Sequence, residues 1–278
     1  MPIDVASLIK PAATASSYLK LCIFGESGCG KTTLAAAAPK PLLIDTERGA
    51  TTLVKNSELA STPVVEAKSL QEVLEICEYL RGPGGAEYET IIVDTMSELT
   101  SLFLDSLIKD SGRTDAYAVG DGMYEKRNQQ GRRVLSDLLS LSKHIILLCH
   151  VDTVKINEIQ TRVPRTTPKI RESIFSLMDV VGYMYLDTER APTAVNPGAT
   201  IKTRKIQTLR TMFVEAKNRL DVPDYIENPT INVFFDAHFA NKAKSPELLA
   251  PVVQLSTALT AAKAIHPTNF TSNIGLKI

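Results

Sequence analysis

The sequence predicts an α/β fold in which helices cover a mainly parallel sheet, with antiparallel strands added at the C-terminal side. Strand-like and helix-like segments alternate through the first half of the chain, as parallel strands with helical crossovers require. Several strand-like runs are almost wholly apolar, which is typical of strands buried on both faces. In the second half, strand-like segments follow one another around a turn rich in Pro and Gly at 192–198.

Apolar runs and their boundaries define the elements of the first half. The run at 19–24 predicts a buried strand, and the next segment indicates a helix from Lys31 to Ala38 that Pro39 ends. Ser69 opens a helix with a capping box, because Glu72 follows three residues later and apolar residues then recur at helical spacing. Further strands are expected at 41–45, 64–67, 90–95 and 144–150, and further helices at 97–109 and 123–142.

The second half of the chain changes character. Residues 151–169 lack apolar periodicity and contain several helix and strand breakers, which predicts a long exposed loop. After it we expect a short helix, three strands and a last helix, at 171–178, 180–186, 200–210, 211–217 and 246–264. These patterns divide the chain into a lead at 1–14, a core at 15–237, and a C-terminal helix and tail at 238–278.

Composition and charge exclude several classes of protein. The chain has 278 residues, with 31 basic and 31 acidic side chains, so it is not a histone-like polycation and any nucleic-acid binding must be local. It contains no signal-peptide pattern and no run of about 18 apolar residues, so we expect no membrane association and a cytoplasmic location. Cys22, Cys29, Cys77 and Cys149 lack CxxC spacing, which predicts reduced thiols rather than disulfides or a zinc site.

The segment GESGCGKT at 25–32 predicts a phosphate-binding loop. It matches the GxxxxGK[ST] pattern, and it follows a strand and opens a helix, as that motif requires. Its glycines let backbone N–H groups turn toward phosphates without Cβ clashes. Lys31 is expected to reach the β- and γ-phosphates of ATP, and the Thr32 hydroxyl to bind Mg²⁺. The residues expected to contact the nucleotide are Gly25, Glu26, Ser27, Gly28, Cys29, Gly30, Lys31, Thr32 and Thr33.

Two acidic segments complete the predicted nucleotide site. Asp94 ends an apolar strand, where a carboxylate can contact Mg²⁺ near the edge at which α/β sheets bind ligands. The alternative is that Asp94 only caps the following helix. Asp45 ends another strand in the same way, and Glu47 follows closely. A hydrolase needs a carboxylate that activates or orients water, and Glu47 is the candidate.

With these segments in place, the chain resembles the RecA-like recombinase ATPases. LLIDTERGA resembles the strand whose glutamate polarises the attacking water, and TIIVDTMSEL resembles the strand with the metal-binding aspartate. HIILLCH resembles the strand that ends in the γ-phosphate sensor. The resemblance implies a RecA-like core with Glu47 as the catalytic carboxylate and His150 at the sensor position, where this group usually has glutamine. A histidine there fits the short phage-type annealing ATPases, which lack flanking domains.

The resemblance also implies a DNA-binding segment after the sensor strand. In the family a mobile loop that grips single-stranded DNA follows this strand, and residues 151–172 take its place here. The cations expected to contact DNA phosphates are Lys155, Arg162, Arg165, Lys169 and Arg171. The alternative is a solvated loop tip. The loop contains no aromatic residue, so base stacking must come from elsewhere, with Tyr117 and Tyr124 as candidates.

A second cationic stretch resembles a segment that acts between subunits. In VEAKNRL, Lys217 and Arg219 match the two family cations that reach the ATP site of a neighbouring subunit. A cation supplied in this way stabilises the charge on the transferred phosphoryl group only when subunits are stacked. The alternative is that both residues are edge-strand charges that prevent unwanted pairing.

The sequence therefore predicts a protein that binds and hydrolyses ATP and uses Mg²⁺ to do so. The resemblance implies that it also binds single-stranded DNA. The resemblance implies annealing or strand exchange in a phage-type recombination system, self-assembly into a filament or ring, and the host cytoplasm as location. It leaves open a single-strand DNA-binding protein as a partner. Two alternatives remain: a small-molecule phosphotransferase, which would form a phosphorylated product, and a nucleotide-gated assembly protein without significant hydrolysis.

Overall fold

The computed structural model describes residues 18–110, 121–190 and 200–243. Residues Ser17–His238 form one compact unit, and the description below concerns this unit. The predicted lead at 1–14, the predicted helix at 246–264, the turn at 192–198 and Tyr117 lie outside the described residues.

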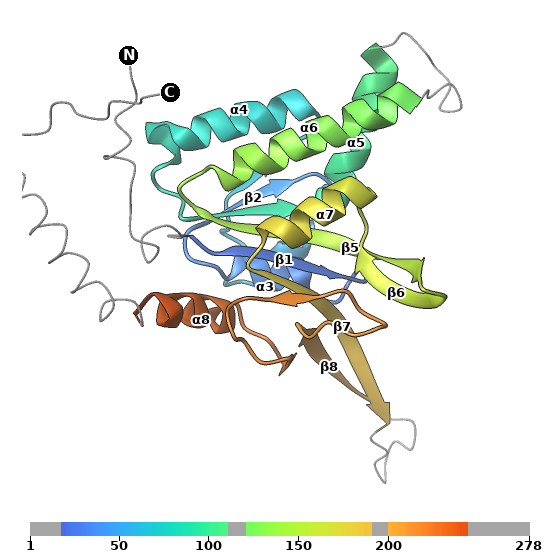
Figure 1. The fold of residues 1–278 in the computed structure, drawn as a ribbon. Helices are drawn as coiled ribbons and strands as arrows, with labels where there is room; N and C mark the ends of the chain where they lie inside the picture. The colour runs from blue at the N-terminus through green and yellow to red at the C-terminus, as the bar shows by residue number, and fades with distance from the viewer. Residues whose placement is uncertain (1–17, 111–120, 191–199, 244–278) are drawn as a thin grey trace, which may run out of the picture. The chain divides into compact units, whose positions relative to one another are not determined.

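The described strands form one ten-stranded sheet that is parallel at its centre, which confirms the predicted α/β class (Figure 1). Six strands pair in parallel in the order β3-β2-β4-β5-β1-β7, and β8 and β10 continue the sheet in antiparallel orientation. β6 pairs with β5, and β9 pairs with β7. The strands are β1 (Lys20–Gly25), β2 (Pro41–Asp45), β3 (Val64–Glu66), β4 (Thr90–Asp94), β5 (His144–Ile156), β6 (Ile159–Pro164), β7 (Val180–Arg190), β8 (Thr200–Gln207), β9 (Lys217–Asn218) and β10 (Tyr225–Glu227).

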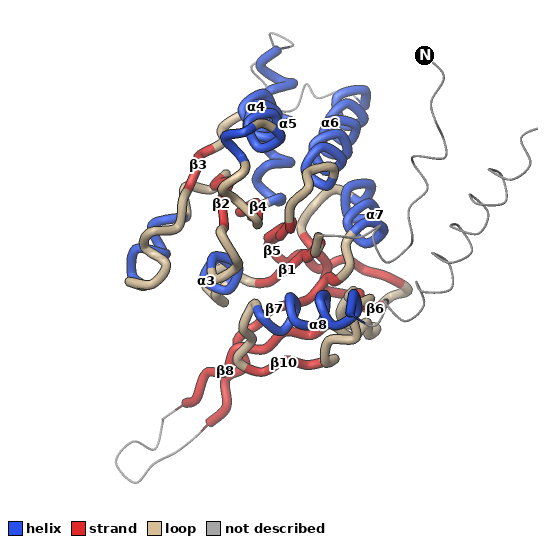
Figure 2. The backbone as a smooth tube through the Cα atoms, turned by 90° about the vertical axis from the view of Figure 1, so that its left-hand side faces the viewer, coloured by secondary structure: helices blue, strands red, loops and turns tan. Residues whose placement is uncertain are grey.

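Helices cover both faces of this sheet (Figures 1 and 2). α4, α5, α6 and α7 bury one hydrophobic cluster against one face, and α3 and α8 bury a second cluster against the other. This sandwich explains why the central strands are apolar along their whole length. The helices are α3 (Lys31–Ala36), α4 (Leu70–Arg81), α5 (Met96–Asp110), α6 (Asp121–Leu139), α7 (Pro168–Leu177) and α8 (Asn232–Ala243), with short 3₁₀ turns η1 (Ala50–Lys55) and η2 (Pro83–Gly85).

The capping box at the start of α4 illustrates how local sequence sets an element boundary. The Ser69 side chain accepts a hydrogen bond from the backbone N–H of Glu72 at 3.2 Å, as predicted. The Glu72 carboxylate accepts one from the N–H of Lys68, one residue before the cap, at 2.7 Å. Apolar residues at helical spacing then bury one face of α4, as predicted, while the opposite face is exposed to water.

The prediction of a long exposed loop at 151–169 is wrong. β5 continues to Ile156 and turns back through β6, so these residues form a β-hairpin that projects beyond the parallel strands (Figure 1). Asn157 and Glu158 have φ values of 47° and 65°, as a two-residue hairpin turn requires. α7 also begins earlier than expected, because Thr167 caps its first turn at 3.4 Å and Pro168 follows.

Two further expectations about the C-terminal half need correction. The segment 211–217 was expected to be a full strand, but within it only Lys217 pairs as one, in β9. Residues 211–214 instead close a turn, in which the N–H of Thr211 donates to the carbonyl of Val214 at 3.0 Å. The helix α8 was not anticipated, although Phe234 and Phe235 bury against the α3 face of the sheet.

Candidate nucleotide-binding and hydrolysis site

The predicted phosphate loop joins β1 to α3. β1 is the central strand between β5 and β7, so its end lies at the middle of the sheet edge. Gly28 and Gly30 have φ values of 79° and 99°, a left-handed conformation that glycine adopts without strain. A Cβ on Gly28 would meet nothing within 4 Å, so the space beside this glycine is open. The open loop and its positive-φ glycines fit a bound triphosphate.

Lys31 and Thr32, the first two residues of α3, point toward this loop and toward β4. The Lys31 Nζ donates to the carbonyls of Gly25 and Glu26 at 3.0 and 2.8 Å, and the residue is only 5% exposed. The Thr32 hydroxyl donates to a carboxylate oxygen of Asp94 at 2.6 Å. This hydroxyl and carboxylate are the oxygen donors that Mg²⁺ prefers, so the pair fits the predicted metal site.

Sheet register brings the acidic residues to the same edge. Asp45 pairs with Asp94 across β2 and β4, and Gly25 pairs with His150 across β1 and β5. The Asp45 carboxylate accepts hydrogen bonds from the N–H groups of Glu47 and Gly49, which folds the segment after β2 back over the strand ends. These residues are distant in sequence, and the parallel sheet gathers them because its strands all end at this edge.

Glu47 lies at the centre of a small hydrogen-bond network. Its carboxylate oxygen contacts the His150 Nε2 at 2.6 Å and accepts from the Thr95 hydroxyl at 2.5 Å. The Thr95 hydroxyl in turn accepts from the backbone N–H of Glu98 at 3.2 Å. The ligand atoms of Glu47, Glu98 and His150 lie within 4.8 Å of one another. The predicted catalytic carboxylate and the predicted sensor therefore touch each other, one strand away from the phosphate loop.

Burial and neighbouring charge make Asp94 an unusual carboxylate. Its pKa is raised above the ordinary value, chiefly by burial and further by the negative charges of Glu47 and Asp45. The hydrogen bond from Thr32 and the charge of Lys31 act in the opposite direction without cancelling this effect. Ionised Asp94 thus costs the folded protein free energy when no cation lies beside it.

We therefore expect Asp94→Asn to raise the melting temperature of the protein without nucleotide or Mg²⁺. Because the folded-state pKa is raised, the gain is full at pH values above that pKa and shrinks as the pH falls through it. Each kcal/mol gained corresponds to roughly 2–4 °C in a domain of this size. Thermal unfolding at several pH values measures the difference between the variant and the wild type.

Asp105→Asn is the matched control, because Asp105 is an exposed carboxylate on α5 and the same change there should leave the melting temperature unaltered. The Asp94 variant should also lose the extra stability that Mg²⁺ and ATP give the wild type. A lower melting temperature for Asp94→Asn at pH 7.5 would contradict the electrostatic argument.

The five cations predicted to contact DNA lie along the β5–β6 hairpin and the start of α7, and most of them are held by acidic residues. Lys155 pairs with Glu158 across the hairpin turn. Arg165 pairs with Glu98 at 3.0 Å, and Lys169 pairs with Glu125 at 2.6 Å. The remaining two cations are Arg171, which lies 3.9 Å from Asp152, and Arg162, whose guanidinium lies over the ring of Tyr183.

Lys217 and Arg219 lie far from this site within the chain. Lys217 pairs with Val181 at the start of β7, whereas the phosphate loop follows the opposite ends of the parallel strands. The Lys217 Nζ donates to the carbonyls of Phe175 and Ser176 and so caps the C-terminal end of α7. Arg219 is exposed. Neither residue can reach the phosphate loop of its own chain.

The sequence analysis missed Arg204, Thr95 and Glu98. Arg204 on β8 lies against the phosphate loop, because a Cβ on Gly30 would come within 3.0 Å of its Nε. No motif marks this arginine, since β8 begins at Thr200, far along the chain from the loop at 25–32. Thr95 and Glu98 were visible only as residues after the metal-binding aspartate, and their contacts with Glu47 and Arg165 depend on strand order.

The four cysteines of the chain are free, as predicted, and all four are buried. Among the described residues, no helix has the length and apolarity needed to cross a bilayer. The phosphate-loop strand between β5 and β7, with Asp94 at the end of β4, defines the class of P-loop nucleoside triphosphatases with a RecA-like fold. A family model described as an AAA domain (AAA_24) matches residues 17–220, so the chain belongs to this family.

No curated protein sequence is significantly similar to this chain. Among solved structures, the crystal structure of the RadB recombinase is similar at 15% sequence identity and a TM-score of 0.41, covering 68% of this chain and 79% of that chain.

Proposed function

We propose that the protein is an ATPase that binds single-stranded DNA and promotes annealing or strand exchange in phage-type recombination. One observation carries the proposal: the β5–β6 hairpin, which holds Lys155 and Arg162, continues directly from His150, the residue that contacts the candidate catalytic carboxylate of Glu47. A ligand that moves the hairpin therefore acts on the hydrolysis site through a few bonds.

The residues of the site suggest how hydrolysis proceeds. Thr32 and Asp94 would hold Mg²⁺, which neutralises charge on the phosphates when it is bound. Lys31 exchanges its two carbonyl partners for phosphate oxygens, and Arg204 adds a second cation beside Gly30. Glu47 orients the attacking water and accepts its proton, while Thr95 and His150 hold the carboxylate in place. Because the Glu47 carboxylate is already held in place, it needs no rearrangement before it accepts the proton of the attacking water.

The contacts of Arg165 support coupling between DNA and hydrolysis. The backbone N–H of Arg165 donates to the carbonyl of His150 at 2.8 Å, and its side chain pairs with Glu98. If a DNA phosphate takes Arg165 from Glu98, one negative charge near Glu47 is released from its partner. We infer that this exchange transmits DNA binding to the catalytic network. The Arg165–Glu98 pair is exposed and therefore weak, so a DNA phosphate can replace Glu98 as the partner of Arg165.

A polar pocket of about 510 Å³ beside this ion pair offers further phosphate contacts. It opens between α5, α6 and the start of α7. Its lining includes two arginines, two carboxylates and several hydroxyl groups: Arg127, Arg165, Glu98, Asp105, Ser97, Thr166 and Thr167. Arginines and hydroxyls in one concave surface suit the sugar–phosphate backbone of DNA. The hairpin and this pocket together define the proposed path of the strand.

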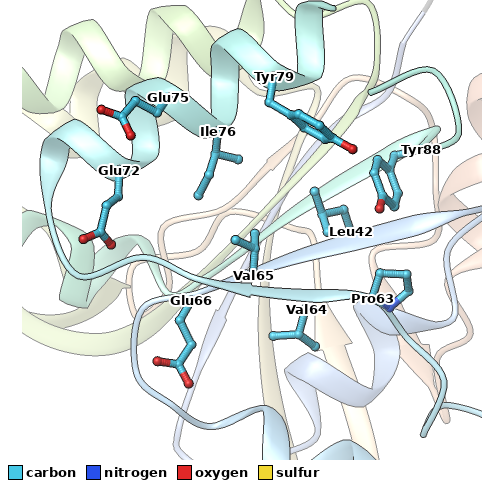
Figure 3. A pocket seen from close by; sticks show the side chains of 10 residues that line it. All are labelled: Leu42, Pro63, Val64, Val65, Glu66, Glu72, Glu75, Ile76, Tyr79 and Tyr88. Carbon is cyan, nitrogen blue, oxygen red and sulfur yellow. The ribbon is translucent and has the colours of Figure 1, made fainter. Parts of the chain in front are cut away.

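Self-assembly is part of the proposal, since Lys217 and Arg219 can act on an ATP site only from a neighbouring copy. β3 is an edge strand, and a groove of about 590 Å³ lies between it and α4 (Figure 3). Tyr79 and Val64 in this groove are 53% and 41% exposed, which is typical of an edge that pairs with another chain. We propose that a second copy of the protein binds there.

Phosphate release measured with and without an oligo-dT strand tests the function. We expect turnover that rises with DNA, and a loss of about 100-fold or more in Lys31→Ala, because the phosphates lose their buried cation. Lys40→Ala is the control, since Lys40 is exposed and pairs with Glu89 away from the loop. DNA binding should weaken with salt at a slope of about −0.7 for each phosphate contacted.

Electron microscopy of the same samples with a non-hydrolysable ATP analogue checks assembly. Ordered stacks on the oligonucleotide are expected, and isolated particles at every concentration would contradict the role of a neighbouring copy. Turnover that ignores DNA, in a protein that never binds an oligonucleotide, would overturn the proposed function itself.

A further inference from the structure

An aromatic pocket lies at the root of the β5–β6 hairpin, on the sheet face that α7 also covers. It has a volume of about 680 Å³, and we call it the tyrosine pocket. Strands β7, β8 and β10, which lie side by side in Figure 2, form its floor. The side chains that define it here are Arg162, Tyr183, Tyr185, Gln207, Phe213 and Tyr225.

The sheet register arranges the three tyrosines of this pocket on one face. Gln207 pairs with Tyr183 on β7 and with Tyr225 on β10, so these three residues form one cross-strand row. Tyr185 is two residues beyond Tyr183 and points to the same face. The rings of Tyr183 and Tyr185 stack with centroids 5.3 Å apart and planes at 15°. Rings held on paired strands lose little conformational freedom when a ligand stacks on them.

The pocket is bonded to the hairpin that carries the proposed DNA contacts. Arg162 donates its backbone N–H to the carbonyl of Phe213 at 2.8 Å and accepts one from Glu215 at 3.0 Å. The Thr161 hydroxyl donates to the carbonyl of Met212 at 2.8 Å. The turn at 211–214 thus fixes Phe213 at the rim of the pocket, beside β6, the strand that holds Arg162.

The charge of the pocket is complementary to a polyanion. Arg162 is the one charged residue among those that line it, and its guanidinium lies 5.7 Å from the centre of the Tyr183 ring. Of the five cations predicted to contact DNA, four lie near a carboxylate, whereas Arg162 forms no salt bridge within the described part of the chain. Burial raises the pKa of both Tyr183 and Tyr185, so the phenols stay neutral at physiological pH.

Large apolar groups at the rim face water. Phe213 is 54% exposed, Tyr225 is 51% exposed and Met212 is 61% exposed. Flat aromatic faces beside the guanidinium of Arg162 suit a ligand in which planar rings alternate with negative charges. A single-stranded nucleic acid is such a ligand, because its unpaired bases expose their faces and each is followed by a phosphate. Paired bases in a duplex do not offer these faces.

We propose that the tyrosine pocket stacks unpaired bases of a single DNA strand on Tyr185 and Tyr225, with Arg162 on an adjacent phosphate. The proposal rests on the proposed binding of single-stranded DNA and adds the residues that distinguish a single strand from a duplex. Stacking on a ring depends little on which base is present, so the pocket tolerates any sequence. It also supplies the aromatic groups that the hairpin itself lacks.

Fluorescence anisotropy with two labelled oligomers of equal length tests this inference: oligo-dT, and the same sugar–phosphate chain without bases. We expect Tyr185→Ala and Tyr225→Ala each to weaken oligo-dT binding about tenfold, since one stacked base is lost. Binding to the abasic chain should be unchanged in both. Tyr185→Phe should bind like the wild type because its ring remains, and Arg162→Ala should weaken binding to both oligomers.

Val54→Ala is the matched control, an exposed apolar side chain on η1 outside the pocket that should leave both affinities unchanged. If the wild type binds neither oligomer, the proposed DNA function fails. If the wild type binds oligo-dT and Tyr185→Ala binds it equally well, the inference alone is overturned. An equal loss on the abasic chain, or a change of oligomeric mass without DNA, would also overturn it, because the rings would then support the hairpin or a second copy.

Discussion

Glu47→Gln is expected to lower ATP turnover by about 10²- to 10⁴-fold, the range for removing a general base. The amide keeps the shape of the carboxylate and can still accept from the Thr95 hydroxyl, so the site stays assembled. Glu47 does not contact the phosphate loop in this structure, and Mg²⁺–ATP should therefore bind with unchanged affinity. Single-turnover phosphate release and nucleotide binding by calorimetry measure the two quantities separately.

Glu98→Gln is the control for this variant, because Glu98 belongs to the same cluster but its carboxylate pairs with Arg165, whereas Glu47 contacts His150 directly. We expect a smaller loss of basal turnover from it and a weaker response to DNA. Unchanged turnover in Glu47→Gln would assign the proton to another group. A phosphorylated small molecule in the wild-type reaction would favour a phosphotransferase, and absence of phosphate release would favour a nucleotide-gated assembly protein.

Gly25→Ala is expected to destabilise the protein by about 3 kcal/mol or more, at the upper end for overpacking. A Cβ at this position would lie 2.0 Å from the carbonyl oxygen of Met184, a backbone atom of the neighbouring strand β7. Gly25 and Met184 are register partners at the centre of the sheet, so neither strand can move away cheaply. The melting temperature should fall by roughly 6–12 °C, and ATP binding should be lost with the loop geometry.

Gly122→Ala provides the comparison for Gly25→Ala. Gly122 lies in α6 with open space where a Cβ would be, so alanine there should keep or slightly raise stability through its better helix propensity. Thermal unfolding of both variants decides the matter. Similar melting temperatures would show that β1 and β7 can separate at this point, against the packing argument.

Most of the nucleotide site could be predicted from the sequence, because its parts are local patterns. The phosphate loop needs only a few residues in order between a strand and a helix. Asp94 and Glu47 were recognisable because Asp94 ends one apolar strand and Glu47 closely follows another, and the ends of parallel strands meet at one edge. The contact between Glu47 and His150 was not predicted, since it depends on which strands are neighbours.

The hairpin at 151–164 was missed although its signals were present. Ile159, Thr161 and Val163 alternate with exposed Gln160 and Arg162, which is strand periodicity once threonine is counted as a strand former. The two-residue turn carries no glycine, so the usual mark of a tight hairpin is absent. Strand-breaking and charged residues in the same stretch favoured a loop, because apolar residues by themselves show no periodicity there.

The sequence by itself determined the class of fold, the phosphate loop and the carboxylates beside it, since each depends on residues close together in the chain. Only the tertiary structure decided that Arg204 lies against Gly30, that Arg165 connects the hairpin to Glu98, and that three tyrosines form one pocket. These contacts join strands that are distant in sequence, and register between such strands arises from the packing of the whole sheet, which no single segment encodes.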